Sequence, residues 1–238
     1  MSFSVRVVLT PSAEQHARLV ALQAAFAEVC NELAPIVQDT RVWNRVALHH
    51  MTYKGLRAKY PQLGSQMVCN AIYSVSRTCR LIFQTPDSPF HLSRLGTRPL
   101  PRLRFAETCP VYFDRHTLSL KDGRVSMFTM DGRIKFQLAL SNDQVEAFRQ
   151  KPLLEIVLQR RAARFELEFL FGPRALLKTD RSDLMAEHPN PPSLQVSGCS
   201  ESGEADGLGG NRQPPVQEEA HSSRPFVPEY LKLEEFVS

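Results

Sequence analysis

The chain opens with a strand-like segment and continues with a helix-like one. In residues 3–9, apolar side chains occupy every second position, which is typical of a half-buried strand. Thr10 and Pro11 then predict the start of a helix, because threonine caps helices and proline suits the first helical position. Apolar side chains recur every three or four residues as far as Leu33, and we expect the helix to run to about residue 34 because Pro35 follows.

Two more helices follow in the prediction. Apolar positions from Leu48 to Tyr60 indicate a short helix that ends at Pro61, and Ser65 is a candidate N-cap for the next one. The apolar stripe of that next helix consists of Val68, Ile72, Val75, Cys79 and Ile82. Its other faces carry polar side chains, namely Gln66, Asn70, Tyr73, Arg77 and Arg80. We therefore expect this helix to pack on one side and to present polar groups on the other.

After a proline-rich connector at residues 84–101, the pattern changes to short strands. The runs with strand-like composition are RLRF, PVYF, TLSL, RVSMFTM, RIKFQLAL, LLEIVLQ and ARFELEFLF. Asp122-Gly123 and Asp131-Gly132 lie between such runs, and Asp-Gly is a preferred hairpin turn. Arg160-Arg161 is expected to turn the last hairpin.

One strand, three helices and then about seven strands predict an α+β fold. We expect an antiparallel, wedge-like β-barrel formed by residues 1–10 and 100–172, with a helical bundle inserted at residues 11–90. Residues 173–238 are rich in proline, serine, glycine and acids, so they are expected to form a disordered tail. At its end, FVPEYLKLEEFVS (226–238) regains large apolar residues and is either a segment that docks on a partner or an inert end.

Size, cysteine content and the N-terminal pattern restrict the class of protein. The 238 residues contain no apolar run expected to span a bilayer, and the first residues lack the pattern of a signal peptide. Five cysteines without CxxC spacing predict free thiols in a reducing compartment. The sequence therefore predicts a cytoplasmic protein without membrane contact.

Charge is unevenly distributed along the chain. Residues 1–178 hold 25 Lys and Arg against 14 Asp and Glu, a net charge of +11, whereas residues 179–238 hold 4 against 11, a net charge of −7. The cations are densest at residues 51–105, where nine of them occur with one acid, Asp87. A basic body indicates a polyanionic partner and a nucleoid-associated protein, and the acidic tail could compete for the same surface.

Residues 48–83 (LHHMTYKGLRAKYPQLGSQMVCNAIYSVSRTCRLIF) carry the most specific signal. They contain cations and no acid, with Arg45 just upstream, and Tyr53, Tyr60 and Tyr73 lie between the cations. Cations displace counterions from phosphates, and aromatic rings stack on bases, so this composition favours a nucleic-acid surface. The alternative is a solvated helical face without a ligand.

The string LHxxxYxxLRxxYPxLxSQ, followed by a helix of the form AIxxVxR, resembles the N-terminal half of the TnpB (OrfB) proteins of insertion sequences, which are RNA-guided nucleases. Further matches in the same order are LTPSAEQ after the first strand, Cys30-Asn31, and RFAETCPVYFDRHTLSLKDGRVSMFTMDGRIKF. The hairpin LLEIVLQRRAARFELEFLF is similar to the one that precedes the nuclease domain. The resemblance reaches about Phe171.

In that family, a wedge barrel and an inserted recognition lobe grip the guide RNA and a short DNA motif. The resemblance therefore implies structured guide-type RNA and double-stranded DNA as partners. By position, it implies base or backbone contacts from Tyr53, Ser65, Gln66, Cys69, Asn70 and Tyr73. Cationic contacts with phosphates are expected from Lys54, Arg57, Lys59, Arg77, Arg80, Arg102 and Arg104.

The nuclease half of the family has no counterpart in this sequence. Its RuvC-like domain needs an Asp on a strand directly after the last hairpin, and later a Glu and a second Asp that hold two metal ions. After Phe171 the first acids are Asp180, Asp183 and Glu187, which lie on no predicted strand, and Cys199 has no CxxC neighbour. We expect no catalytic residue, no metal site and no cofactor.

Two other polar groups are weak candidates for chemistry. His49 and His50 are adjacent, so a helix would direct them to different faces. Asp114, Arg115 and His116 are expected in a turn between strands, where a surface role is the simpler interpretation.

Three functional hypotheses follow. The first is a nucleic-acid-binding protein without nuclease activity of its own. The second is one half of a split RNA-guided DNA endonuclease, in which another chain supplies the RuvC-like domain and the C-terminal FVPEYLKLEEF segment docks on it. The third is a truncated or frame-shifted transposon remnant whose tail is translated out of frame.

Overall fold

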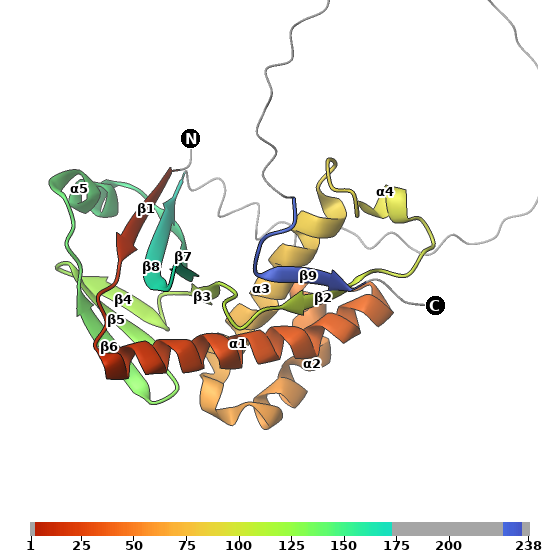
Figure 1. Cartoon of the computed structure of the whole chain (residues 1–238), viewed down its shortest axis with the longest axis horizontal. Coiled ribbons are helices and arrows are strands. Elements are labelled where there is room, and N and C mark those ends of the chain that lie inside the picture. The colour runs from red at the N-terminus through yellow and green to blue at the C-terminus, as the bar shows by residue number, and fades with distance from the viewer. Residues whose placement is uncertain (1–2, 173–225, 235–238) are drawn as a thin grey trace, which may run out of the picture.

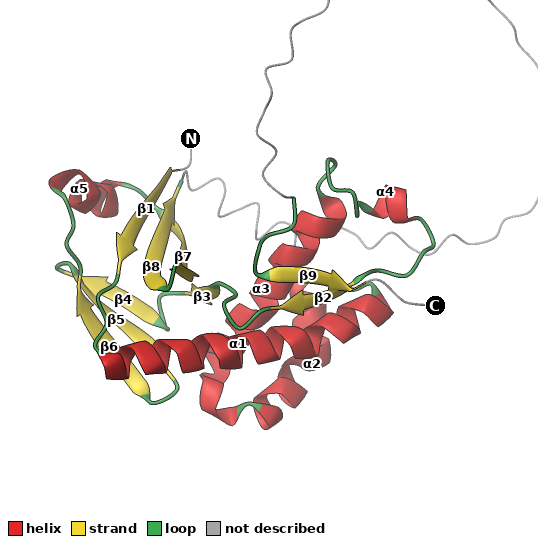
Figure 2. Cartoon of the chain, in the orientation of Figure 1, coloured by secondary structure: helices red, strands yellow, loops and turns green. Residues whose placement is uncertain are grey.

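The structure, a computed structural model, describes residues 3–172 and 226–234. Helices precede a series of antiparallel strands, which confirms the predicted α+β class. Figure 1 shows the long helix α1 (Ala13–Thr40) running under both ends of the molecule, with most strands over one end and the other long helices at the other end. Figure 2 shows the same division by type of secondary structure.

The start of α1 differs by two residues from the prediction. Ser12, and not Thr10, is the N-cap: its hydroxyl accepts a hydrogen bond from the Gln15 amide at 3.2 Å, and the Gln15 side chain accepts one from the Ser12 amide at 3.0 Å. This reciprocal pair is a capping box, which satisfies two amides that the helix itself leaves without partners.

The predicted end of α1 at Pro35 is wrong, because the turn beyond the proline is anchored. Val37 is buried, and the Gln38 side chain donates a hydrogen bond to the Leu100 carbonyl at 2.9 Å. These contacts compensate for the one backbone hydrogen bond that a proline removes from a helix. The helix ends at Thr40, before Arg41 with a left-handed φ of 56°.

Three amide side chains of α1 bond the backbone of residues 100–109. Besides Gln38, Gln23 donates to the Cys109 carbonyl at 3.1 Å. Asn31 makes two bonds to one residue, since it donates to the Phe105 carbonyl at 2.9 Å and accepts from the Phe105 amide at 2.8 Å. The helix thereby bonds laterally to strand β2 (Arg102–Phe105), as a neighbouring strand would.

In the described part of the chain, α1 is the one helix long and apolar enough to cross a membrane, with a mean hydropathy of 1.3 over 18 residues. The expectation that no run reaches this length is therefore corrected. More than half of that window, 56%, is buried inside the protein, and α1 packs on α3 (Gly64–Gln84) and β2. We interpret α1 as the core helix of a globular fold.

The other two predicted helices are present as α2 (Arg45–Lys59) and α3, joined by the short 3₁₀ turn η1 (Pro61–Leu63). All five predicted stripe residues of α3 are buried. Ser65 lies inside α3 and does not cap it. The connector after α3 contains the single-turn helix α4 (Leu92–Leu95).

The prediction that Asn70 lies on the polar face of α3 is wrong. Its side chain is 5% exposed, and its amide donates to the Tyr112 carbonyl at 3.1 Å. The reason is that α3 packs against α1, α2 and strand β3 (Val111–Phe113), so its buried surface is wider than one stripe.

Each predicted strand run contains a strand. Besides β1 (Phe3–Val8), β2 and β3, these are β4 (Leu118–Lys121), β5 (Arg124–Thr129), β6 (Gly132–Gln137), β7 (Leu153–Arg161) and β8 (Arg164–Phe171). Asp122-Gly123 turns the β4–β5 hairpin with φ of 51° and 72°, as predicted, and Asp131-Gly132 lies at the β5–β6 turn. The last hairpin turns at Ala162-Ala163, with φ of 44° and 65°, and not at Arg160-Arg161, which still pair within the ladder.

The predicted closed barrel is wrong. The strands form separate sheets in the orders β1-β8-β7-β3 and β4-β5-β6. Helix α5 (Asn142–Gln150), which the sequence reading missed, carries the chain away after β6, so β6 and β7 do not pair. Its Phe148 packs edge-on against Phe169 and Phe171, with ring centroids 4.9 and 5.0 Å away.

A ninth strand lies in the segment predicted to be disordered. β9 (Leu231–Glu234) pairs antiparallel with β2 and forms a two-stranded sheet. Leu231 is buried, and Phe226, Val227, Tyr230 and Leu233 pack against the core. The predicted disorder is therefore wrong for residues 226–234, whereas residues 173–225 and 235–238 lie outside the described part of the chain.

Candidate nucleic-acid interface

Cations from α2 come together with polar side chains of α3. The Arg45 guanidinium lies 5.2 Å from the centre of the Tyr73 ring, a cation–π distance. Burial raises the pKa of the Cys69 thiol on α3, and the positive charges of Arg45 and Arg57 act in the opposite direction. We call Arg45, Arg57, Gln66, Cys69 and Tyr73 the α2–α3 face.

A groove adjoins the α2–α3 face. Its volume is about 1280 Å³, and it lies between α5, β7 and the β4–β6 sheet. Apolar side chains such as Phe113, Leu118 and Phe148 line it. Its polar lining consists of cations and acids together with neutral polar groups, and includes Arg45, Gln66, Asp114, Arg115, His116, Asp122, Arg149 and Glu155. Cations from α2, from the β3–β4 turn and from α5 thus meet around one concave surface, together with three acids.

The β3–β4 turn holds two of these groups in place. The Asp114 carboxylate accepts hydrogen bonds from the His116 amide at 3.1 Å and from the Thr117 amide at 3.0 Å, which is an Asx-type turn. Arg115 and His116 are exposed beside the groove. The sequence reading set this turn aside as plain surface, although an Asp three residues before a Thr signals a turn of fixed shape.

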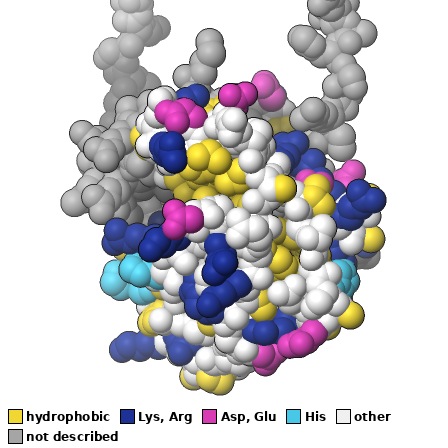
Figure 3. Space-filling model, turned by 90° about the vertical axis from the view of Figure 1, so that its left-hand side faces the viewer, with side chains coloured by type: hydrophobic (Ala, Val, Ile, Leu, Met, Phe, Trp, Pro, Cys, Tyr) yellow, Lys and Arg dark blue, Asp and Glu magenta, His cyan; other side chains and the backbone are white. Residues whose placement is uncertain are grey.

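On the side that carries α5 and β4–β6, hydrophobic side chains gather in a patch with Lys and Arg on several sides of it (Figure 3). Asp and Glu side chains also lie at the border of this patch, so the face carries charges of both signs (Figure 3).

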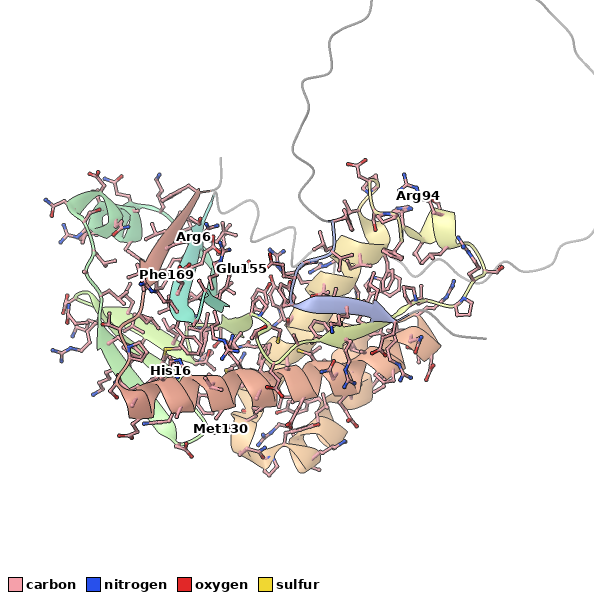
Figure 4. The ribbon with its side chains drawn as sticks, viewed as in Figure 1. Arg6, His16, Arg94, Met130, Glu155 and Phe169 are labelled. Atoms are coloured by element: carbon pink, nitrogen blue, oxygen red, sulfur yellow. The ribbon has the colours of Figure 1, made fainter. Side chains whose placement is uncertain are left out.

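A polar cluster joins α3 to the four-stranded sheet. Tyr73 donates a short hydrogen bond to the Glu155 carboxylate, which Arg77 also contacts at 3.4 Å. Arg77 further bonds the Tyr112 hydroxyl at 3.3 Å. Burial acts to lower the pKa of Arg77, but Tyr112 and Glu155 outweigh it and raise the pKa. In Figure 4, Glu155 lies where the strands approach the helices.

The remaining predicted contact residues occupy other positions. Lys59 forms an ion pair with Glu32 of α1 at 2.7 Å, and the Tyr53 ring stacks on His49 with centroids 4.5 Å apart. Lys54 and Ser65 are exposed, and Arg80 is half-buried.

Arg102 and Arg104 lie apart from the α2–α3 face. Both are exposed on β2, and Arg102 donates to the Gln38 side chain at 3.1 Å. The structure thus places Arg57, Gln66 and Tyr73 on the packed helices α2 and α3, links Arg77 to Tyr73 through Glu155, and places Arg102 and Arg104 on β2. Asn70 is buried and forms its hydrogen bonds inside the protein. For every one of these residues, contact with nucleic acid stays a prediction.

Among residues 3–172 and 226–234, no three His, Cys, Asp or Glu side chains are grouped so that they could hold a metal ion. The rings of His49 and His50 lie 5.9 Å apart at a right angle. Burial lowers the pKa of His49, with further contributions from His50 and Arg45. Asp180, Asp183, Glu187 and Cys199 lie outside the described residues.

Comparison with known proteins gives no family for the chain. No protein-family model matches it, and no curated protein matches it.

Proposed function

We propose that this protein binds nucleic acid through the α2–α3 face and the adjoining groove, without nuclease activity of its own. The observation that carries the proposal is the meeting of Arg45, Arg115 and Arg149, from three different elements, around one concave surface. Residues 41–105 hold 11 Lys and Arg and one acid, Asp87, so acids from elsewhere in the chain must supply any neutralisation.

The chemistry suits a polyanion that also has flat, hydrogen-bonding groups. Cations release counterions from phosphates, and this makes affinity depend on salt. The Gln66 amide beside the groove can both donate to and accept from a base edge. Structured guide-type RNA and double-stranded DNA are the proposed ligands, in keeping with the motifs shared with the recognition lobe of TnpB proteins.

Two observations weigh against the alternatives. The C-terminal segment that a split nuclease would use for docking on another chain pairs with β2 of its own chain. In addition, β9 directs Leu231 and Leu233 inward and Lys232 and Glu234 outward, and such an alternation fitted to β2 is not expected from out-of-frame translation.

The test is a titration of fluorescent duplex DNA and of structured RNA at several salt concentrations. We expect measurable binding at low salt, with an affinity that falls as salt rises. Arg45→Ala and Arg57→Ala should each reduce the salt slope by roughly one phosphate contact. Gln66→Ala should leave that slope unchanged and reduce discrimination between sequences.

Arg6→Ala is the matched control. Arg6 is also exposed, but it lies on β1 and is paired with Glu168 at 2.9 Å, so its loss should leave the salt slope unchanged. Absence of binding to both ligands at low salt would refute the proposal, and equal effects of Arg6→Ala and Arg57→Ala would refute the assigned surface.

A further inference from the structure

β2 has two lateral edges with different partners. On one edge the backbone of Phe105 is bonded twice by the Asn31 side chain of α1. On the other edge lies β9, and the Ala106 amide next to β2 donates to the Tyr230 carbonyl at 2.9 Å. Figure 1 shows β9 beside β2, above α1. The second edge is therefore an acceptor for one strand, and the chain's own C-terminal segment fills it.

The register identifies which amides hold this strand. Hydrogen-bonded pairs alternate along an antiparallel ladder. Because Ala106 and Tyr230 form such a pair, the next ones are Arg104 with Lys232 and Arg102 with Glu234. The Phe105 amide faces α1 instead. Hydrogen exchange at the Arg102 and Arg104 amides therefore reports whether β9 is attached, and exchange at the Phe105 amide serves as an internal reference.

Apolar packing also holds the C-terminal segment in place. Leu231 is buried, and Tyr230 packs against the core. Burial raises the pKa of the Tyr230 phenol. The segment thus covers apolar side chains as well as the edge of β2.

The charges on β9 weaken its pairing with β2. On the exposed face of the two-stranded sheet, Glu234 lies opposite Arg102, which is favourable, but Lys232 lies opposite Arg104. Like charges directly opposite each other destabilise a strand pair. A two-stranded sheet is also marginal by itself. β9 is therefore held mainly by Leu231 and by the apolar side chains that flank it.

We propose that residues 226–234 are an intramolecular peptide ligand of a strand-acceptor site on β2, and that they lower the affinity of the neighbouring cations for nucleic acid. The regulatory part rests on the proposed function. While the strand is bound, Glu234 lies opposite Arg102, and the backbone amides of Arg102 and Arg104 are occupied. When it leaves, these groups become accessible to a phosphate backbone.

Two substitutions at one position test the proposal in the full-length chain. Lys232→Pro removes the amide that faces Arg104, whereas Lys232→Gln removes the same positive charge and keeps the amide. Charge alone predicts that both variants bind nucleic acid more weakly than wild type. The proposal predicts that Lys232→Pro binds more tightly, by about tenfold if the strand occupies its site nine-tenths of the time.

Attachment of the strand is measured separately, by amide hydrogen exchange at single residues. In Lys232→Pro, exchange at Arg102 and Arg104 should accelerate, while Phe105 should stay protected by Asn31. In Lys232→Gln, which removes the like-charged pair with Arg104, none of the three should exchange faster than in wild type. A synthetic peptide of residues 226–238, added in excess to Lys232→Pro, should restore protection at Arg104 and reverse the gain in affinity.

The outcomes separate the two proposals. Unchanged exchange at Arg102 and Arg104 in Lys232→Pro would overturn the acceptor site. Accelerated exchange with no gain in affinity would overturn the regulatory role and leave nucleic-acid binding by wild type intact. If wild type and both variants fail to bind any nucleic acid, the proposed function and the regulatory role fall together, and the exchange data still decide whether β2 is an acceptor.

Discussion

The chain forms two strand pairs between residues far apart in the sequence, and they differ in almost every respect. β1 and β8 pair over six residues, and β8 is flanked on its other side by β7. The rings of Phe3 and Phe171 stack 5.1 Å apart, and Arg6 pairs with Glu168. β2 and β9 pair over four residues, without a third strand and with Lys232 opposite Arg104.

We infer from this difference that the β1–β8 pair is part of the stable fold, whereas the β2–β9 pair can open. β1 and β8 belong to the four-stranded sheet, and Phe169 and Leu167 of β8 are completely buried. β9 contributes one buried leucine and several half-buried side chains. Local opening requires little free energy where few apolar contacts are lost. We therefore expect β9 to detach while β1 stays paired, and the following predictions test this contrast.

The largest expected effect is on the β1–β8 side. Phe169→Ala removes a buried ring that α5 also contacts through Phe148. Such a change should lower the free energy of unfolding by about 3–5 kcal/mol. Urea unfolding followed by circular dichroism measures it. A loss below about 1 kcal/mol would contradict the central position that we assign to β8.

Leu231→Ala should have a smaller global effect, although Leu231 is also buried. The loss should be about 2 kcal/mol or less, the lower end for a buried leucine, because the segment can open locally without unfolding the rest. Exchange at Arg104 should accelerate strongly while β8 amides stay protected. If β8 amides accelerate in parallel, the two strand pairs form a single cooperative unit and the comparison fails.

Arg6→Ala should lower the free energy of unfolding by less than about 1 kcal/mol, because the Arg6 side chain is 52% exposed and the ion pair with Glu168 is solvated. The difference from wild type should shrink in high salt. Thermal unfolding at low and high salt gives both values. A loss that does not depend on salt would show that the Arg6 side chain acts through packing.

The smallest expected effect comes from a variant that strengthens the β2–β9 pair. Lys232→Glu converts a like-charged pair with Arg104 into an opposite-charged one. It should stabilise β9 by roughly 0.2–1 kcal/mol and slow exchange at Arg104 accordingly. Glu229→Gln, which removes a charge outside the ladder, is the control and should leave exchange unchanged.

Much of the fold could be predicted because local patterns agree with tertiary packing. The stripe on α3 and the Asp-Gly turns are examples in which the local preference and the final environment coincide. Other elements could not be predicted in this way. The capping box at Ser141 and Gln144 announces α5, but the sequence analysis assigned no element to residues 141–152, which lie between two strand-like runs.

Tertiary contacts override local signals at the remaining positions. Pro35 is tolerated because Gln38 is bonded beyond it. The turn at Ala162-Ala163 has no glycine, and the pairing of the long β7 and β8 imposes its left-handed backbone.

Similar limits apply to the candidate site. Composition shows where along the chain cations are frequent, but not which elements bring them together. Arg115 and Arg149 join Arg45 at the groove only through the arrangement of the turn and α5. Asn70 could not be recognised as internal, because its burial depends on the neighbouring β3. β9 escaped notice because its partner is more than one hundred residues earlier in the sequence.

The Asn31 side chain has a consequence for solubility. Its amide uses both backbone groups of Phe105, and so it closes one edge of β2 permanently, without a second strand. Only the edge under β9 can be uncovered, and an uncovered strand edge is a template for pairing with another molecule. We expect chains that lose the last residues through proteolysis to associate through β2. Because Asn31 blocks the other edge of β2, this association should stop at pairs and not extend into fibres.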